Sequence, residues 1–238
     1  MGGETGNTAV TVMWRRHFSA LLNSSKNCEI DNFVCQNIIS NGHFEGIDML
    51  MCNSFKIKYM LHKLPLNCAA GKDDIFAEHI FYADSNVCNH LSSLFNVHLL
   101  HRTISQVCMQ TVIVPICKNK NGNISDAGNY RPVSLATIIS KLFEHYILAC
   151  IPPRLATTDN QFGFKPKLGT DICIFLLKQN VSYYVSKDTP VFSAFLDASK
   201  AFDRTNHNLL FAKLIKRNVP MSIVRLLLSW YRQQTMQV

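Results

Sequence analysis

The chain has 238 residues, of which 47% are hydrophobic and 17% are charged. This length and apolar content suffice for one large domain or two small ones, and they exclude a chain that is disordered, collagen-like or a coiled coil throughout. The charged fraction lies below the roughly 25% typical of soluble domains. We therefore expect part of the surface to be covered by a partner or by a further piece of the same fold.

Positive charge is concentrated in the second part of the chain. Residues 1–103 carry 8 Lys and Arg against 9 Asp and Glu, whereas residues 104–238 carry 16 against 7. A basic half in a chain of low overall charge indicates a polyanionic partner, most often nucleic acid, because each neutralised phosphate releases counterions. A basic face that is merely solvated stays open as the alternative.

The sequence shows no feature of export or membrane insertion. No apolar run approaches the roughly 18 residues of a membrane span, and the N-terminus has neither the basic start nor the apolar stretch of a signal peptide. The 9 Cys include no C-x-x-C pair, which favours scattered, reduced thiols over a disulfide framework. We expect an intracellular protein, nuclear or cytoplasmic, with no membrane partner and no other protein partner that the sequence identifies.

In chain order, the first predicted elements are helices followed by a hairpin. Residues 1–60 mix short apolar stretches with Asn, Ser and Gly, which predicts short helices and loops in a linker-like region. Apolar positions at helical spacing predict a helix over residues 83–100. Residues 111–117 are rich in β-branched side chains and residues 131–135 follow a run with turn chemistry, which predicts a two-stranded flap that bears Lys and Arg.

The second half of the chain predicts helices around one short strand. Residues 191–196, Val-Phe-Ser-Ala-Phe-Leu, have the composition of a buried strand, and Asp197 follows at its C-terminal end. Helices are predicted over residues 138–151, over residues 171–184 and in two segments after residue 203, with Pro220 in the first turn of the second segment. This order of elements is typical of an α+β fold and not of a regular βαβ alternation.

The most informative stretch is Phe-Leu-Asp-Ala-Ser-Lys-Ala-Phe-Asp, residues 195–203. A carboxylate such as that of Asp197, at the end of a buried strand, is costly unless it is paired with a cation or bound to a metal. A divalent ion that bridges substrate phosphates would fill that role, because carboxylate and phosphate oxygens form the usual Mg²⁺ environment. The alternative is structural: Asp197 would cap the following helix through backbone N–H groups.

This stretch is the last of four segments that follow one another in a recognisable order. They are residues 69–78, Ala-Ala-Gly-Lys-Asp-Asp-Ile-Phe-Ala-Glu; residues 114–144, with Asn-Tyr-Arg-Pro-Val-Ser-Leu at their centre; residues 161–170, beginning Gln-Phe-Gly-Phe-Lys; and residues 195–210. Together they resemble the opening segment, the fingers segment, the motif that follows it and the first palm motif of reverse transcriptases from non-LTR retrotransposons, of the LINE or jockey-like kind. The matches lie within residues 63–218, and their conjunction is more specific than any one of them.

The resemblance implies RNA-templated DNA synthesis by two-metal nucleotidyl transfer. It implies a right-hand polymerase fold, of which this chain would hold the fingers and an incomplete palm, helix-rich with a β-hairpin and a short palm strand. Residues 61–238 would form the reverse transcriptase domain, after an N-terminal helical region over residues 1–60. The implied partners are an RNA template, a DNA primer and a dNTP, and the implied cofactor is Mg²⁺.

The resemblance also implies roles for four residues around the nucleotide. Asp197 matches the catalytic, metal-binding aspartate, and Phe202 matches the bulky residue that excludes a 2′-hydroxyl from the incoming nucleotide. Arg131 matches the fingers arginine that contacts the triphosphate, with Lys118 on the opposing strand as its partner. A mobile hairpin that carries Arg and Lys can close on a polyphosphate. The alternative is that both residues are solvated basic tips.

Gly163 and Lys165 match the segment that contacts template or primer. A glycine at position 163 allows the backbone to approach a nucleic acid closely. An ordinary turn between packed aromatic residues, Phe162 and Phe164, is the alternative.

Two departures from the family pattern matter. Asp74 stands where the family has the second glycine of Gly-x-Asp-Gly, which leaves the local turn undecided. Residues 204–238 contain no Asp or Glu, whereas two-metal transfer needs carboxylates on both sides of the metals, and the family supplies them in a later Asp-Asp hairpin. We therefore expect a chain truncated after the first palm motif and inactive by itself; the alternative is a non-catalytic nucleic-acid-binding remnant.

Overall fold

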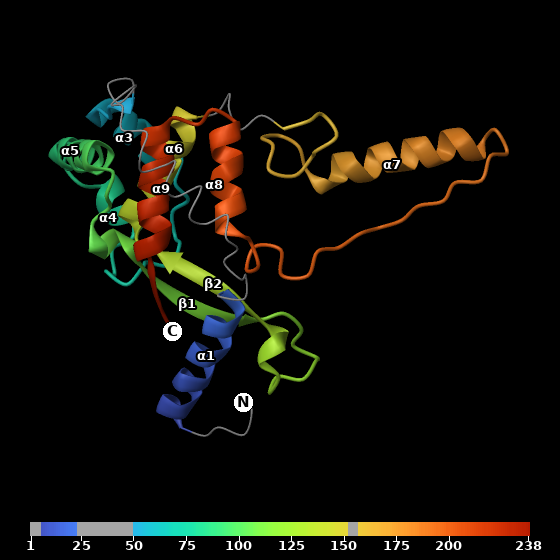
Figure 1. The fold of residues 1–238 in the computed structure, drawn as a ribbon, viewed down its shortest axis with the longest axis horizontal. Coiled ribbons are helices and arrows are strands. Elements are labelled where there is room, and N and C mark those ends of the chain that lie inside the picture. The colour runs from blue at the N-terminus through green and yellow to red at the C-terminus, as the bar shows by residue number, and fades with distance from the viewer. Residues whose placement is uncertain (1–5, 23–49, 152–156) are drawn as a thin grey trace. The chain divides into compact units, whose positions relative to one another are not determined.

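The computed structural model describes residues 6–22, 50–151 and 157–238, drawn as a ribbon in Figure 1. Contacts between backbone segments divide the chain into two units. The first unit comprises residues 1–154 and 202–238, and the second comprises residues 155–201.

The first unit contains a three-stranded sheet in the order β2-β1-β3. β1 (Gln110–Cys117) pairs antiparallel with β2 (Tyr130–Ala136), which forms the predicted flap, and β3 (Thr235–Gln237) pairs parallel with β1. Pro115 and Pro132 lie opposite each other in this register. The Lys118 N–H donates to the Asn129 carbonyl. Because hydrogen-bonded and non-hydrogen-bonded residue pairs alternate along an antiparallel ladder, the two prolines form a pair that exchanges no backbone hydrogen bonds. Their missing N–H groups therefore leave the ladder intact.

Helix α1 (Asn7–Leu22) covers one face of the hairpin, as Figure 1 shows. The rings of Trp14 and Phe18 stack with 5.3 Å between centroids, and Trp14 meets Tyr130 edge to face at 4.9 Å. Ile113 belongs to the same buried cluster. Side chains alternate between the two faces of a strand. Ile113 and Tyr130 therefore point toward α1, and the residues next to them along each strand point away from α1.

A group of helices builds a second core in the same unit. α3 packs against α5 and α6, and α9 packs against α5 and α8. The ring centroid of Phe143 lies 4.7 Å from that of Phe95 and 6.0 Å from that of Trp230, and all three side chains are buried. These contacts join segments that are far apart in sequence. The helices are α3 (Ser54–Leu61), α4 (Ala77–Phe81), α5 (Ser85–His101), α6 (Ile138–Cys150), α8 (His207–Lys216) and α9 (Met221–Gln233).

A tight turn at Gly71 and Asp74 packs against the end of the hairpin. A Cβ atom added to Gly71 would lie 2.7 Å from the Thr137 amide nitrogen, so this backbone leaves no room for a side chain. The Asp74 N–H donates to the Gly71 carbonyl at 3.3 Å, and Asp74 has a φ of 53°. A left-handed φ suits glycine best, and Asp and Asn tolerate it more readily than other residues. The turn therefore forms with Asp74 in the place of the second glycine.

The second unit holds helix α7 (Thr170–Val185) and the extended stretch that follows it. The strand predicted over residues 191–196 is wrong, because these residues form no ladder with any part of the chain that the structure describes. Phe192 is 93% and Leu196 98% exposed, so the expected buried setting of Asp197 is wrong as well. A strand needs a neighbour that pairs with its N–H and C=O groups, and an apolar, β-prone composition does not supply one.

The hairpin and the helices predicted from residue 83 onward are confirmed, whereas α1 in the region predicted to hold short helices is 16 residues long and packs against the hairpin. The helices correspond to α5, α6, α7, α8 and α9 and the hairpin to β1 and β2, so the helix-rich α+β class is correct. Pro220 is the N-cap of α9, one position before its predicted place in the first turn. Residues 23–49 of the predicted N-terminal helical region lie outside the described residues, as does Pro152.

Candidate functional site

The hairpin has an open face, opposite the one that packs against α1. Ile116, Lys118, Arg131 and Val133 share this face, because residues paired across a ladder and residues two apart on a strand point the same way. Ile116 is 49% and Val133 41% exposed, and both cations are exposed as well. The structure thus brings Lys118 and Arg131, the two residues predicted to contact a triphosphate, to one accessible surface, with Lys118 directly after β1 and Arg131 on β2.

The loop between β1 and β2 is organised by the side chain of Asn129. Its Nδ2 donates to the carbonyl of Asn119 at 2.8 Å and to that of Asn123 at 3.3 Å, and its Oδ1 accepts from the Asn119 N–H at 3.1 Å. The Nζ of Lys118 donates to the Gly128 carbonyl at 2.8 Å. The Lys118 side chain is therefore held against the loop, in a defined position.

Lys118 and Arg131 offer complementary contacts to an anion. A guanidinium presents a planar fork of N–H groups for bidentate bonds to phosphate, and an ammonium supplies a compact charge with three donors. The carbonyl that accepts from Lys118 is uncharged, so the positive charge of this residue is not cancelled there. The open face of the hairpin can therefore bind a polyphosphate through both residues.

Asp197 and Phe202, predicted for the metal and the sugar, belong to different units. Asp197 lies exposed on the extended stretch of the second unit, and Phe202 lies in the first unit and is 77% exposed. The Phe202 carbonyl accepts from the Thr205 N–H at 3.2 Å. The N-cap of the following helix, α8, is Asn206, whose Oδ1 accepts two backbone N–H groups. The interpretation of Asp197 as a helix cap is therefore wrong.

The described residues do not form a complete metal centre. Among them, no three His, Cys, Asp or Glu side chains lie close enough together to hold one metal ion. An exposed carboxylate such as that of Asp197 fits a partial role, because Mg²⁺ usually takes one or two carboxylates together with phosphate oxygens and water. A centre with two ions needs more carboxylates than this one.

The loop before α7 carries the residues predicted to contact template or primer. A Cβ atom added to Gly163 would meet no heavy atom within 4 Å, and the Lys165 Nζ donates to the Thr158 carbonyl at 2.6 Å. Phe164, between them, is 89% exposed and has a φ of 62°. The alternative of a turn between two packed aromatic residues is therefore wrong for Phe164.

Groups with shifted pKa values lie in the helical core of the first unit. Burial raises the pKa of the Cys52 thiol to about 11 and lowers the pKa of His98. The His98 Nε2 accepts from the Ser105 N–H at 3.3 Å, and its ring meets that of Phe143 edge to face. Both side chains are buried, and they serve as packing groups in their neutral forms.

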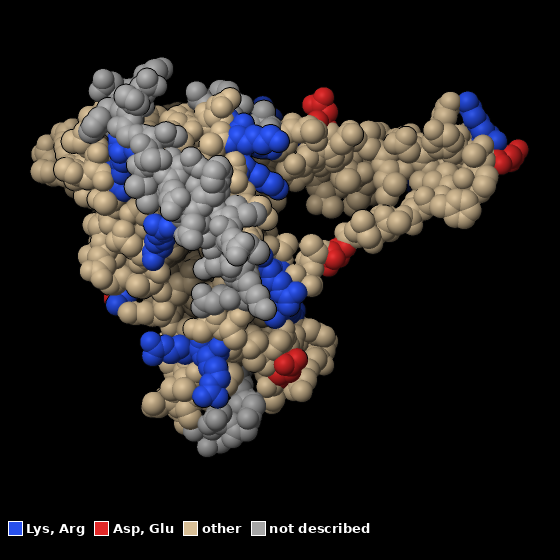
Figure 2. Space-filling model, viewed as in Figure 1, with Lys and Arg blue, Asp and Glu red and all other residues tan. Residues whose placement is uncertain are grey.

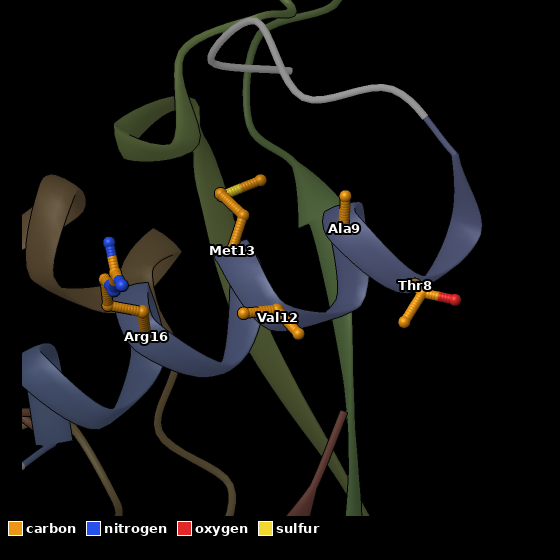
Figure 3. A pocket seen from close by; sticks show the side chains of 5 residues that line it. All are labelled: Thr8, Ala9, Val12, Met13 and Arg16. Carbon is orange, nitrogen blue, oxygen red and sulfur yellow. The ribbon is translucent and has the colours of Figure 1, made fainter.

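A pocket on the first unit involves none of the predicted site residues. The lining residues that the structure describes come from successive turns of α1, as the close-up in Figure 3 shows. We assign no function to this pocket. The lining residues are Thr8, Ala9, Val12, Met13 and Arg16.

Charged and apolar side chains are distributed unevenly over the surface. Figure 2 shows Lys and Arg side chains on several parts of the first unit and an almost uncharged surface along most of α7. Exposed apolar residues on α7 include Ile174 at 60%, Phe175 at 56% and Val185 at 57%. Within the described ranges, no helix combines the length and the apolar character that crossing a bilayer requires.

Known proteins match this chain over most of its length. A sequence profile described as "Reverse transcriptase (RNA-dependent DNA polymerase)" matches residues 117–238. The RNA-directed DNA polymerase from mobile element jockey of Drosophila melanogaster is 29% identical over 195 residues, which cover 77% of this chain and 20% of that protein. The probable RNA-directed DNA polymerase from transposon BS of Drosophila melanogaster is 24% identical over 182 residues, 75% of this chain and 20% of that protein. The chain thus spans a fifth of the length of these two relatives.

Proposed function

We propose, since this chain belongs to the reverse transcriptase family and is of the non-LTR, jockey-like kind, that residues 61–238 form the fingers and part of the palm of a right-hand polymerase. Residues 1–60 would precede this domain as a helical region. The protein would serve RNA-templated DNA synthesis for a mobile element, with an RNA template, a DNA primer and dNTPs. The observation that carries the proposal is the placement of Lys118 and Arg131 on one open face of the hairpin.

The hairpin would bind the triphosphate of the incoming dNTP. Arg131 would make two parallel N–H bonds to phosphate oxygens, and the Lys118 ammonium would turn from the Gly128 carbonyl toward the phosphates. Phe202, whose ring is 77% exposed, would lie against the sugar and exclude a 2′-hydroxyl. Each of these roles uses a side chain that is accessible in the structure.

Asp197 would contribute one carboxylate to a divalent ion, for which we propose Mg²⁺ because carboxylate and phosphate oxygens are its usual ligands. A bound ion of this kind neutralises the charge that develops on transferred phosphate. Gly163 and Lys165 would contact template or primer, the lysine through a phosphate. In this proposal the nucleotide roles and the template roles fall on separate segments of the chain.

Binding of a dNTP to the 238-residue chain tests the role of the hairpin. We expect Arg131→Ala and Lys118→Ala each to weaken binding by about tenfold or more, because each removes charge-assisted hydrogen bonds worth roughly 1.5–3 kcal/mol. Lys120→Ala is the matched control, since Lys120 is an exposed cation in the loop between the same two strands. Isothermal titration calorimetry measures the affinity of each variant for dNTP, and equal affinities of all three variants would contradict the proposal.

We also propose that these 238 residues do not extend a primer by themselves. Two-metal transfer needs several carboxylates, and residues 204–238 provide none after the first palm motif. The test offers the purified chain a primed RNA template, dNTPs and Mg²⁺ or Mn²⁺, with no extension expected. Extension that disappears in Asp197→Asn would overturn this part of the proposal.

The second candidate function is binding of nucleic acid without catalysis. The excess of Lys and Arg after residue 103 favours it, because such residues release counterions from phosphates. Affinity for RNA should then fall as salt rises, with a log–log slope set by the number of phosphate contacts. Absence of any binding to RNA or an RNA/DNA duplex at low salt would exclude this function.

A further inference from the structure

Two cysteines from distant parts of the sequence lie together in the first unit. Cys52 directly precedes the N-cap of α3, and Cys150 is the last residue of α6. The hydroxyl of Tyr146 is hydrogen-bonded with the thiols of both. Tyr146 and Cys150 are four positions apart on α6, so their side chains lie on the same face of that helix. The two thiols are therefore neighbours, and both are free in this structure.

Hydrogen bonds hold Cys52 in place against two helices. Its N–H donates to the Asn96 Oδ1 at 2.7 Å, and its carbonyl accepts from the Asn96 Nδ2 at 2.9 Å. Asn96 lies on α5, and on the other side the Tyr146 hydroxyl of α6 donates to the Leu50 carbonyl. The Cys52 side chain is only 5% exposed. Cys52 therefore keeps a defined position next to α6 without a covalent bond.

A cation lies beside the two thiols. The Lys56 Nζ is 5.8 Å from the centre of the Tyr146 ring and donates to the Met51 carbonyl at 3.1 Å. Burial raises the pKa of both thiols, to about 11 at Cys52, and the positive charge of Lys56 opposes this rise at each of them. The thiolate is the form that reacts with oxidants, and Lys56 favours that form. Cys150 is partly exposed, so a small oxidant can reach it.

We propose that Cys52 and Cys150 form an oxidation site, at which hydrogen peroxide converts the two thiols into an intramolecular disulfide. The Cys150 thiolate attacks one peroxide oxygen; the O–O bond breaks, and the other oxygen leaves as hydroxide, which combines with the thiol proton as water. The Cys52 sulfur then attacks the sulfenic acid on Cys150 and displaces its hydroxyl group as a second water. The two thiols lose two protons and two electrons, and one peroxide is reduced to two waters.

A disulfide fits this pair better than a metal ion does. Among the described residues, no third His, Cys, Asp or Glu joins the two thiols in a group that could hold a metal. The bond would connect the segment before α3 to the end of α6. Such a crosslink stabilises a fold chiefly by restricting the unfolded chain, so the oxidised protein should be the more stable form.

The experiment treats the 238-residue chain with hydrogen peroxide at pH 8, blocks the remaining thiols with iodoacetamide and digests the product with chymotrypsin. Cuts after aromatic and leucine residues leave Cys52 within residues 45–55 and Cys150 within residues 147–155, each without another cysteine. We expect mass spectrometry to find these two peptides joined, and dithiothreitol to separate them. In Cys150→Ser, the buried Cys52 thiol should remain reduced.

Matched variants test the setting of the two thiols. Cys117→Ser should leave the rate of linkage unchanged, because Cys117 is partly exposed like Cys150 but lies on β1. Lys56→Gln should slow linkage by about twofold or more, since a unit charge a few ångströms away acts even through water. Lys58→Gln should not slow it: Lys58 is an exposed cation of the same helix, and residues two apart on a helix face different directions.

Thermal unfolding gives a second readout. We expect the oxidised chain to unfold at a temperature higher by about 5 °C or more, an increase that dithiothreitol reverses. If Cys52 and Cys150 stay unlinked while the exposed thiols of Cys68 and Cys173 are oxidised, the inference is overturned. It is also overturned if the link joins only separate chains, or if it lowers the unfolding temperature, because the folded structure would then have to distort to form it.

Discussion

Gly71 lies so close to Thr137 that an added Cβ atom would be 2.7 Å from the amide nitrogen of Thr137. Backbone cannot yield as a flexible side chain can, so Gly71→Ala should lower the free energy of unfolding by about 1–3 kcal/mol, as overpacking does. Gly163→Ala is the control, because its Cβ would meet no atom within 4 Å. Denaturant unfolding followed by circular dichroism measures both, and an equal effect of the two substitutions would contradict the role of this contact.

The left-handed conformation of Asp74 predicts an unusual order of stabilities. Its φ is 53°. In this conformation alanine lowers the stability by roughly 1 kcal/mol, whereas asparagine and glycine adopt it more readily. Asp74→Ala should therefore destabilise the protein by about 1 kcal/mol, while Asp74→Asn and Asp74→Gly should leave the free energy of unfolding nearly unchanged. Thermal unfolding of the three variants checks this order, which a loss of charge alone would not produce, since all three remove the carboxylate.

The hydrogen bonds of Asn129 predict a local effect on the hairpin loop. Asn129→Ala removes the amide that bonds to both backbone groups of Asn119 and to the Asn123 carbonyl. We expect amide hydrogen exchange of residues 118–124 to accelerate, with a loss of global stability of only about 1 kcal/mol, because these groups can bond to water instead. Asn121→Ala, in the same loop, is the control, and equal exchange in both variants would argue against an organising role.

The burial of His98 predicts a loss of stability in mild acid. Because burial lowers its pKa in the folded state, the unfolded chain binds the proton more tightly. The contribution of neutral His98 to the free energy of unfolding is fully present above the pKa of histidine in the unfolded chain, near 6.5. As the pH falls from there toward the pKa of the folded state, this contribution is lost by at most about 1.4 kcal/mol per pH unit. The measurement compares the unfolding free energies of the unchanged chain and His98→Gln between pH 7.5 and 5.5.

His98→Gln retains an acceptor for the Ser105 N–H but does not titrate. The difference between the two proteins should therefore shrink on acidification, whatever the other histidines contribute. A difference that stays constant with pH would show that His98 is not a source of the acid sensitivity.

The helices and the hairpin could be predicted because their signals are local. The apolar spacing that marks α5, α6 and α9 lies within each helix, and the turn chemistry before Tyr130 lies within the hairpin. β3 could not be predicted, because Thr-Met-Gln has no strand pattern and the strand depends on the free edge of β1. Residues 191–196 were predicted as a strand and form none, for the same reason. A strand needs a neighbouring strand to pair with, and the composition of one segment does not show whether that neighbour exists.

The part of the candidate site on the hairpin was predictable, because the pairing of its two strands determines which residues share a face. Once the hairpin is assigned, pairing of Ile116 with Arg131 puts Lys118 on the same face as that arginine. The loop before α7 is held by hydrogen bonds that Gln161 and Lys165 donate to the Gly163 and Thr158 carbonyls, which no periodicity reveals. The exposed setting of Asp197 follows from the lack of a strand paired with residues 191–196 in the described part of the chain, and the composition of one segment does not reveal whether it has such a neighbour.

Pairing of β3 with β1 determines when the sheet can be completed on the ribosome. Beside these strands the Gln234 Nε2 donates to the Thr111 Oγ1 at 3.2 Å, across 123 positions of sequence. The hairpin can form from neighbouring residues soon after it emerges, whereas the third strand is synthesised much later. During that interval one edge of β1 is bare, so a nascent chain stalled in translation would expose a template for pairing with other chains.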